Sequence, residues 1–159
     1  MKTLCLGCMN EYEGEFEVCP YCGYVQGTPP KKAFHITPGV VLKKRYLVGQ
    51  VLGFGGFGIT YIGFDTVLQK KVAIKEYFPS EFATRMPNQT KVIVYAGEKQ
   101  EQFHAGMKKS LEEAQRLAEF QQTPGITWIQ DFFEENNTAY IVMELLEGET
   151  LKDKLQRDG

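Results

Sequence analysis

The chain has 159 residues, of which 43% are hydrophobic and 24% charged, and its formal net charge is −2 at pH 7. These values are typical of a globular protein and exclude a disordered tail, while the small net charge gives no overall basic field for nucleic acid. No apolar run approaches the roughly 18 residues that span a bilayer, and the first residues do not form a signal peptide. We therefore expect a cytoplasmic, reducing setting for this segment, whatever anchor a parent protein could carry beyond Gly159.

The first predicted unit is residues 1–26, which contain all four cysteines as Cys5-x-x-Cys8 and Cys19-x-x-Cys22. Two residues between the cysteines of a pair let both thiolates reach one metal ion from a single tight turn. The paired spacing resembles a zinc ribbon and predicts a structural Zn²⁺ site, with two disulfides in one of three pairings as the alternative. So small a unit cannot bury enough core to fold unaided, so the metal would supply much of its folding free energy.

The two cysteine pairs differ in where their glycine stands. Gly23 follows the second pair, where it can take the left-handed backbone conformation and turn N–H groups toward the sulfurs. Gly7 lies inside the first pair, so that turn can differ from the second. Lys2 is the one basic residue of 1–26, and four thiolates on Zn²⁺ keep a net negative charge, which disfavours nucleic acid. We therefore expect a structural role or a protein partner for this unit.

A polar stretch with two prolines begins at Gly27, and we assign residues 27–38 as a linker before a second domain at 39–159. Strand-like runs and one helical run follow in the order three strands, a helix and two strands. The expected strands are Arg45–Leu52, Ile59–Phe64, Lys71–Tyr77, Ile126–Phe133 and Thr138–Glu144, the last two joined by the turn 135–137. The helix is expected over Glu98–Gln122, ending at Thr123-Pro124-Gly125, with an apolar face of Phe103, Met107, Ser110, Leu111, Ala114, Leu117 and Ala118.

A glycine-rich motif of the form G-x-G-x-x-G spans Gly53–Gly58. The same letters open a dinucleotide-binding unit when a helix follows, but here the β-branched and aromatic run 59–64 follows. The order strand, loop, strand favours a hairpin whose backbone N–H groups can lie over phosphates. A plain glycine-rich turn is an equally good interpretation of this motif taken alone.

The next run, Val72-Ala73-Ile74-Lys75, resembles the third strand of protein kinases, and the motifs from about residue 40 onward follow the order of that family. Within the family, the chain resembles bacterial serine/threonine kinases. The resemblance implies that Lys75 contacts the α- and β-phosphates of ATP and that a helix glutamate holds this lysine. The family pattern places that glutamate just before an alanine, which selects Glu113 and leaves Glu112 as a solvated charge.

The run 138–151 resembles the fifth strand and the hinge of a kinase. Met143 matches the gatekeeper residue beside the adenine pocket, while the Glu144 carbonyl and the Leu146 amide match the adenine hydrogen-bonding positions. Thr150 and Asp153 resemble a capping pair that opens a last helix. The full set of ATP-binding residues implied by the resemblance is Leu52, Gly53, Gly55, Gly56, Phe57, Gly58, Thr60, Ala73, Lys75, Met143, Glu144 and Leu146.

The resemblance implies an α+β fold: a kinase-like N-terminal lobe made of a five-stranded antiparallel sheet and one long helix, preceded by the four-cysteine zinc ribbon. Two features depart from the family pattern. Thr60 stands where the glycine loop usually has valine, and residues 76–97 form an unusually long link, with a β-like run at 91–95, to which we assign no function.

The sequence has no His-Arg-Asp loop and no Asp-Phe-Gly motif, the elements that supply the catalytic base and the Mg²⁺ ligands. We therefore expect a fragment of a longer serine/threonine kinase, inactive by itself, whose complete form uses ATP and Mg²⁺ to phosphorylate a protein substrate. The alternative is a non-catalytic binding module in which the zinc ribbon and the kinase-like lobe dock a protein partner. A downstream His-Arg-Asp and Asp-Phe-Gly would discriminate between the two.

Overall fold

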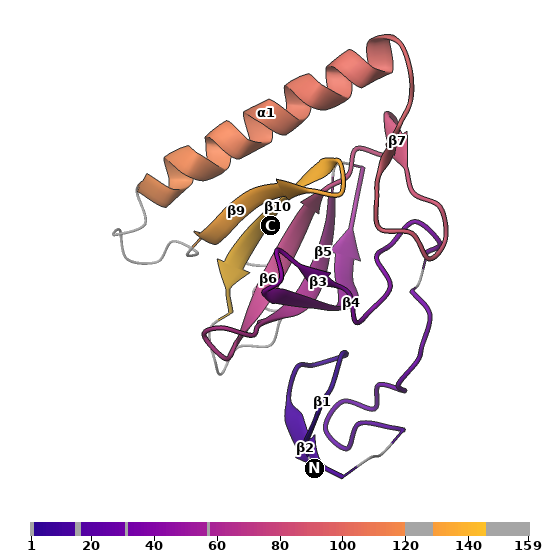
Figure 1. Cartoon of the computed structure of the whole chain (residues 1–159), viewed down its shortest axis with the longest axis vertical. Helices are drawn as coiled ribbons and strands as arrows, with labels where there is room; N and C mark the ends of the chain where they lie inside the picture. Colours follow the sequence, from indigo (N-terminus) through magenta and orange to yellow (C-terminus); the bar gives the residue numbers. More distant parts are fainter. Residues whose placement is uncertain (1, 15–16, 31, 57, 120–128, 146–159) are drawn as a thin grey trace.

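The computed structural model describes residues 2–14, 17–30, 32–56, 58–119 and 129–145 (Figure 1). Its main sheet is antiparallel and has six strands in the order β3-β4-β5-β6-β10-β9. The pairs β1-β2 and β7-β8 form two small separate sheets. The elements are β1 (Lys2–Leu4), β2 (Glu11–Glu13), β3 (Val41–Leu42), β4 (Tyr46–Phe54), β5 (Gly58–Asp65), β6 (Lys70–Tyr77), β7 (Ala83–Thr84), β8 (Ile93–Val94), α1 (Glu98–Glu119), β9 (Ile129–Glu135) and β10 (Thr138–Glu144).

The predicted order of three strands, one helix and two strands is confirmed, and the two-residue β3 adds a sixth strand at the sheet edge. The helix begins at the predicted Glu98. Its predicted end at residues 123–125 lies outside the described residues, as does the capping pair at 150 and 153. Asn136 and Asn137 both have positive φ, 56° and 64°, which suits a tight hairpin between β9 and β10.

The main sheet has two differently covered faces, because side chains alternate along each strand. We call them the Lys75 face and the Glu76 face, after two successive residues of β6. On the Lys75 face, α1 lies over β9 and β10. The Glu76 face carries the main apolar core, to which the segment 34–42 and the link 78–94 both contribute. The long link that the sequence left unassigned is therefore part of the core of the lobe.

A buried ionic network lies in the core on the Glu76 face. The side chains of Glu76 and Arg85 are fully buried, and their closest N–O distance is 2.5 Å. Tyr61 and Tyr140 donate hydrogen bonds to the two oxygens of Glu76, at 2.9 and 2.6 Å. Burial and the Glu76 charge raise the pKa of both tyrosines, so their hydroxyls stay protonated and remain donors.

Arg85 also ties the two covering segments together. Its guanidinium donates to the backbone oxygen of Phe34 at 2.8 Å and to that of Thr90 at 2.9 Å. The amide of Ile36 in turn donates to the Tyr61 hydroxyl at 3.1 Å. Residues before the sheet and residues of the long link thus meet at one buried cation.

The apolar face predicted for α1 is only partly buried. Phe103 and Ala114 are buried, whereas the side chain of Leu117 is 44% exposed. The reason is that Leu117 lines an open cavity between α1 and the sheet and does not pack into the core. The remaining four positions are half-buried: Met107, Ser110, Leu111 and Ala118. The expectation that all seven positions are buried is therefore wrong and holds only for Phe103 and Ala114.

Candidate functional site

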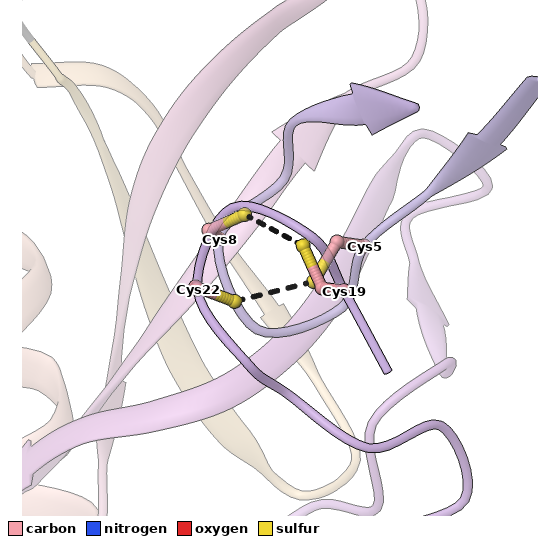
Figure 2. A group of neighbouring side chains, drawn as sticks. All are labelled: Cys5, Cys8, Cys19 and Cys22. Carbon is pink, nitrogen blue, oxygen red and sulfur yellow. Dashed lines mark hydrogen bonds between the residues drawn. The ribbon is translucent and has the colours of Figure 1, made fainter. Parts of the chain in front are cut away.

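The four cysteines converge at one point, as Figure 2 shows. Their sulfur atoms all lie within 4.8 Å of one another, with Cys5 to Cys22 at 3.6 Å and Cys8 to Cys19 at 3.9 Å. A tetrahedral Zn²⁺ with zinc–sulfur bonds of about 2.3 Å requires sulfur atoms about 3.8 Å apart. A disulfide needs about 2.05 Å, and all four thiols are free. The donor set and its spacing therefore fit a structural Zn²⁺.

The two cysteine turns have the same backbone pattern although their glycines stand in different places. The amide of Met9 donates to the Cys5 carbonyl at 2.7 Å, and that of Gly23 donates to the Cys19 carbonyl at 3.0 Å. Met9 has a φ of 61° and Gly23 one of 81°, so a methionine takes a conformation that usually favours glycine. The first turn thus matches the second.

Backbone and side-chain donors surround the sulfurs. The amides of Gly7 and Tyr21 donate to Cys5 and Cys19 at 3.2 and 3.3 Å, as predicted for thiolate ligands. The side-chain amide of Asn10 donates to Cys8 at 3.4 Å. Burial raises the pKa of the Cys5 thiol to about 12, so this group keeps its proton at neutral pH unless a cation displaces it.

The strand register brings the predicted nucleotide-binding residues of the sheet side by side on the Lys75 face. Thr60 of β5 is paired with Lys75 of β6, and Ala73 of β6 is paired with Met143 of β10. Gly53 is paired with Thr60, which places the end of β4 beside them. Alternate residues of neighbouring strands therefore form one continuous surface, although they are up to 90 positions apart in the sequence.

Lys75 and Glu113 line the same cavity between α1 and the sheet, which has a volume of about 340 Å³. Met143 and Leu117 line it too. Glu112 instead lines a separate hollow together with Phe132 and Glu134. The choice of Glu113 over Glu112 therefore stays a prediction from the sequence. Among the ion pairs of the described residues, none joins Lys75 to Glu113.

The glycine-rich motif forms the turn between β4 and β5. The amide of Gly55 donates to the Gly58 carbonyl at 2.9 Å, and Ser80 of the long link donates to the Gly56 carbonyl at 3.2 Å. A Cβ on Gly58 would lie 2.9 Å from the Glu76 carbonyl oxygen, so β5 and β6 meet closely beside Lys75. Phe57 and Leu146 lie outside the described residues, and Leu52 and Glu144 stand near the ends of β4 and β10, close to this surface.

A larger hollow of about 990 Å³ lies elsewhere, between β8, the first half of α1 and the β9–β10 turn. Its described lining includes Lys91, Met107 and Glu134 but none of the residues predicted from the sequence to bind a ligand. The larger hollow also contains a lysine and carboxylates. We place the candidate site at the smaller cavity because it is the one shared by Lys75 and Glu113, and because Gly58 of the glycine-rich turn lies beside Lys75.

Sequence reasoning missed the residues that support the site. Glu76 gave a signal that could have been used, because it follows Val72 and Ile74 at a spacing of two and so falls on the buried face of its strand. A carboxylate there needs a cationic partner, but only the fold reveals that Arg85 supplies it. The contacts of Asn10 gave no signal in the sequence.

No protein-family model matches the chain. A protein described as a probable serine/threonine-protein kinase of Clostridium acetobutylicum is 30% identical over 121 residues, which are 76% of this chain and 15% of that protein. The serine/threonine-protein kinase PknA of Mycobacterium tuberculosis is 33% identical over 126 residues, 76% of this chain and 25% of PknA. The solved structure of the apo form of PpkA-294 matches with a TM-score of 0.66 and 31% identity, covering 78% of this chain and 43% of that one. The chain thus spans a quarter or less of the two sequence relatives.

Proposed function

Because this chain contains the N-terminal lobe of a bacterial-type serine/threonine protein kinase, we propose that its Lys75 face binds ATP. In the complete protein, the lobe would present ATP for phosphoryl transfer to serine or threonine of a protein substrate. The observation that carries the proposal is the cavity that Lys75 shares with Glu113, beside the glycine-rich turn. Lys75 would contact the α- and β-phosphates, and Glu113 would hold its ammonium in place.

The resemblance implies roles for the other predicted residues. The turn at 53–58 would lie over the phosphates, and Thr60, Ala73 and Met143 would form the roof and back of the adenine pocket. The Glu144 carbonyl and the Leu146 amide would bind the adenine edge. The Mg²⁺ ligands and the catalytic base would come from a second lobe, as the resemblance implies.

The two neighbouring glutamates of α1 provide a matched test. In the complete protein, Glu113→Gln is expected to lower kcat/KM for phosphoryl transfer about 10²-fold, because Lys75 loses the charge that positions it. Glu112→Gln, one residue away and directed to another hollow, should leave kcat/KM unchanged. Steady-state kinetics with varied Mg-ATP measures both. Equal losses in the two variants would remove Glu113 from its assigned role.

For the four-cysteine unit, residues 1–26, we propose a structural Zn²⁺ held by Cys5, Cys8, Cys19 and Cys22. Freshly reduced protein is expected to contain one zinc per chain by elemental analysis, and Cys8→Ser should lower the content at limiting zinc, because one of four ligands is lost. Protein that holds no zinc after reduction, or that keeps its full zinc content when all four cysteines are serine, would contradict the assignment.

We also propose the division into a four-cysteine unit, a connecting segment at 27–38 and a kinase lobe from residue 39, with the end of the connecting segment, Phe34 and Ile36, packed on the core of the lobe. Among the residues that the structure describes, no helix is long and apolar enough to cross a membrane.

A complete protein without phosphoryl transfer under any metal and ATP condition would favour the alternative, a module that docks a protein partner.

A further inference from the structure

The first cysteine turn is packed against the Lys75 face of the lobe. Met9 is 2% exposed and belongs to one apolar cluster with Ile62 and Phe64 of β5. Partly buried leucines from both parts of the chain complete this cluster: Leu4, Leu6, Leu47, Leu52 and Leu145. We call the lobe's share of this contact the knuckle seat: Leu47, Gly49, Gln50, Leu52, Ile62, Phe64, Lys71 and Leu145. Leu52 is one of the residues predicted to bind ATP, and Leu145 lies between Glu144 and Leu146, which are proposed to bind adenine.

Strand β4 is shaped to receive this turn. Its pairing with β5 shifts register between Val48 and Val51, which leaves the amide of Gln50 free of β5. That amide donates to the Leu6 carbonyl at 2.9 Å, and the Gln50 side chain donates to the Gly7 carbonyl at 2.8 Å. A Cβ on Gly49 would overlap the Leu6 carbonyl oxygen and would come within 2.6 Å of the Met9 methyl carbon. The carbonyls of Leu6 and Gly7 therefore both accept hydrogen bonds from Gln50, which stands at the register shift of β4.

A chain of hydrogen bonds leads from the sheet to a metal-ligating sulfur. The Lys71 ammonium donates to the Asn10 side-chain oxygen at 2.5 Å, and the Asn10 side-chain nitrogen donates to Cys8 at 3.4 Å. Lys71 stands on β6 four residues before Lys75 and so on the same face. It also brings a positive charge next to a centre that four thiolates and Zn²⁺ would leave negative.

We propose that Lys71 and the rest of the knuckle seat couple the four-cysteine centre to the nucleotide-binding face, so that metal occupancy and ATP affinity depend on each other. The nucleotide half of this statement rests on the function proposed above. The physical reason is that one apolar cluster contains both Met9, next to the ligand Cys8, and Leu52, at the front of the adenine roof. We expect zinc to strengthen ATP binding by holding Met9 in this cluster, and because coupling between two sites is reciprocal, ATP should strengthen zinc binding by the same factor.

The first test measures zinc affinity of the 159-residue chain by competition with a chelator, with zinc itself as the probe. Lys71→Met is expected to weaken zinc binding about 10-fold to 100-fold, the usual cost of removing a residue that orients a metal ligand. The matched control is Lys70→Met, because Lys70 precedes Lys71 on β6 and so lies on the opposite face of the sheet, where its ammonium is 3.7 Å from Glu144. Equal zinc affinity in wild type and Lys71→Met would overturn the coupling.

A glycine pair on β4 tests the contact independently of the lysine. Gly49→Ala should weaken zinc binding, because the added carbon displaces the Leu6 carbonyl. Gly53→Ala should leave zinc binding unchanged. Gly53 stands four residues further along the same strand, and among the described residues no other atom lies within 4 Å of the added carbon. Amide hydrogen exchange of the wild-type chain gives a readout that needs no variant. Removing zinc should speed exchange at Gln50, whereas faster exchange confined to residues 2–26 would overturn the proposal.

The nucleotide half is tested in the complete protein. Chelating zinc from the wild-type protein should raise KM for ATP several-fold with little change in kcat, and restoring zinc should restore KM, since typical coupling between two sites is about 5-fold to 150-fold. In Lys71→Met this response of KM to zinc should be smaller, because the variant removes one of the coupling contacts. An active enzyme whose KM for ATP does not respond to zinc would overturn this half. A complete protein without any phosphoryl transfer would overturn the proposed function instead, while the zinc affinities and hydrogen exchange would still decide whether the knuckle seat is coupled to the metal.

Discussion

Arg85→Met is expected to lower the free energy of unfolding by about 3–5 kcal/mol, the usual cost of leaving one charge of a buried pair without its partner. Glu76 and Arg85 are both fully buried as side chains, so water cannot replace the lost guanidinium. The variant also removes the donor to the Phe34 and Thr90 carbonyls, which hold the two covering segments on the Glu76 face. Chemical denaturation of zinc-loaded protein measures the change.

Two further variants separate the ion pair from general packing. The double variant Glu76→Met with Arg85→Met should lose less free energy of unfolding than the sum of the two single changes, because it leaves no unpaired carboxylate. Arg116→Met, at the exposed end of α1, should cost less than about 1 kcal/mol. Strict additivity of the two single changes would show that the pair contributes nothing as a pair.

Lys75→Met in the complete protein is expected to reduce kcat/KM for phosphoryl transfer by about 10²–10³-fold, the scale seen when one charge-stabilising donor is removed. The loss follows from the proposed contact of the Lys75 ammonium with the α- and β-phosphates. The fold should survive, because the Lys75 side chain forms no ion pair with the described residues, so none is lost. The backbone of β6 also keeps its pairing with Thr60 and Ile141.

The control for this change is Lys108→Met on the exposed side of α1, which should leave both kcat and KM as in wild type. Thermal unfolding of the Lys75→Met protein should match that of wild type, which separates a lost contact to ATP from a damaged lobe. Wild-type turnover by Lys75→Met would exclude Lys75 from phosphate binding.

The parts of the fold that follow local rules could be predicted from the sequence. Alternating apolar residues gave the strands around Ile59 and Ile74, the 3.6-residue period gave the helix, and the Cys-x-x-Cys spacing predicted that the four cysteines lie close together. Lys75 and Glu113 came from motif order, and the structure places them in one cavity.

The rest depends on contacts between distant residues, which local patterns do not encode. Arg85 lies in a link with little regular structure, yet it becomes the buried partner of Glu76 only after β6 and the link have packed together. The contact of Met9 with the lobe depends on the register shift in β4, which cannot be predicted from any single residue type. The same holds for Leu117, whose helical spacing suggested burial although its surroundings leave it exposed.

The contact between the first cysteine turn and β4 also limits how this protein can be rearranged by gene fusion. Joining residues 1–26 to a different lobe would leave Met9 without its pocket, and a lobe without them would expose Ile62 and Phe64. A side chain larger than glycine at position 49 would displace the Leu6 carbonyl and the Met9 methyl group. A substitution on one side of the contact is therefore expected to need a compensating one on the other side.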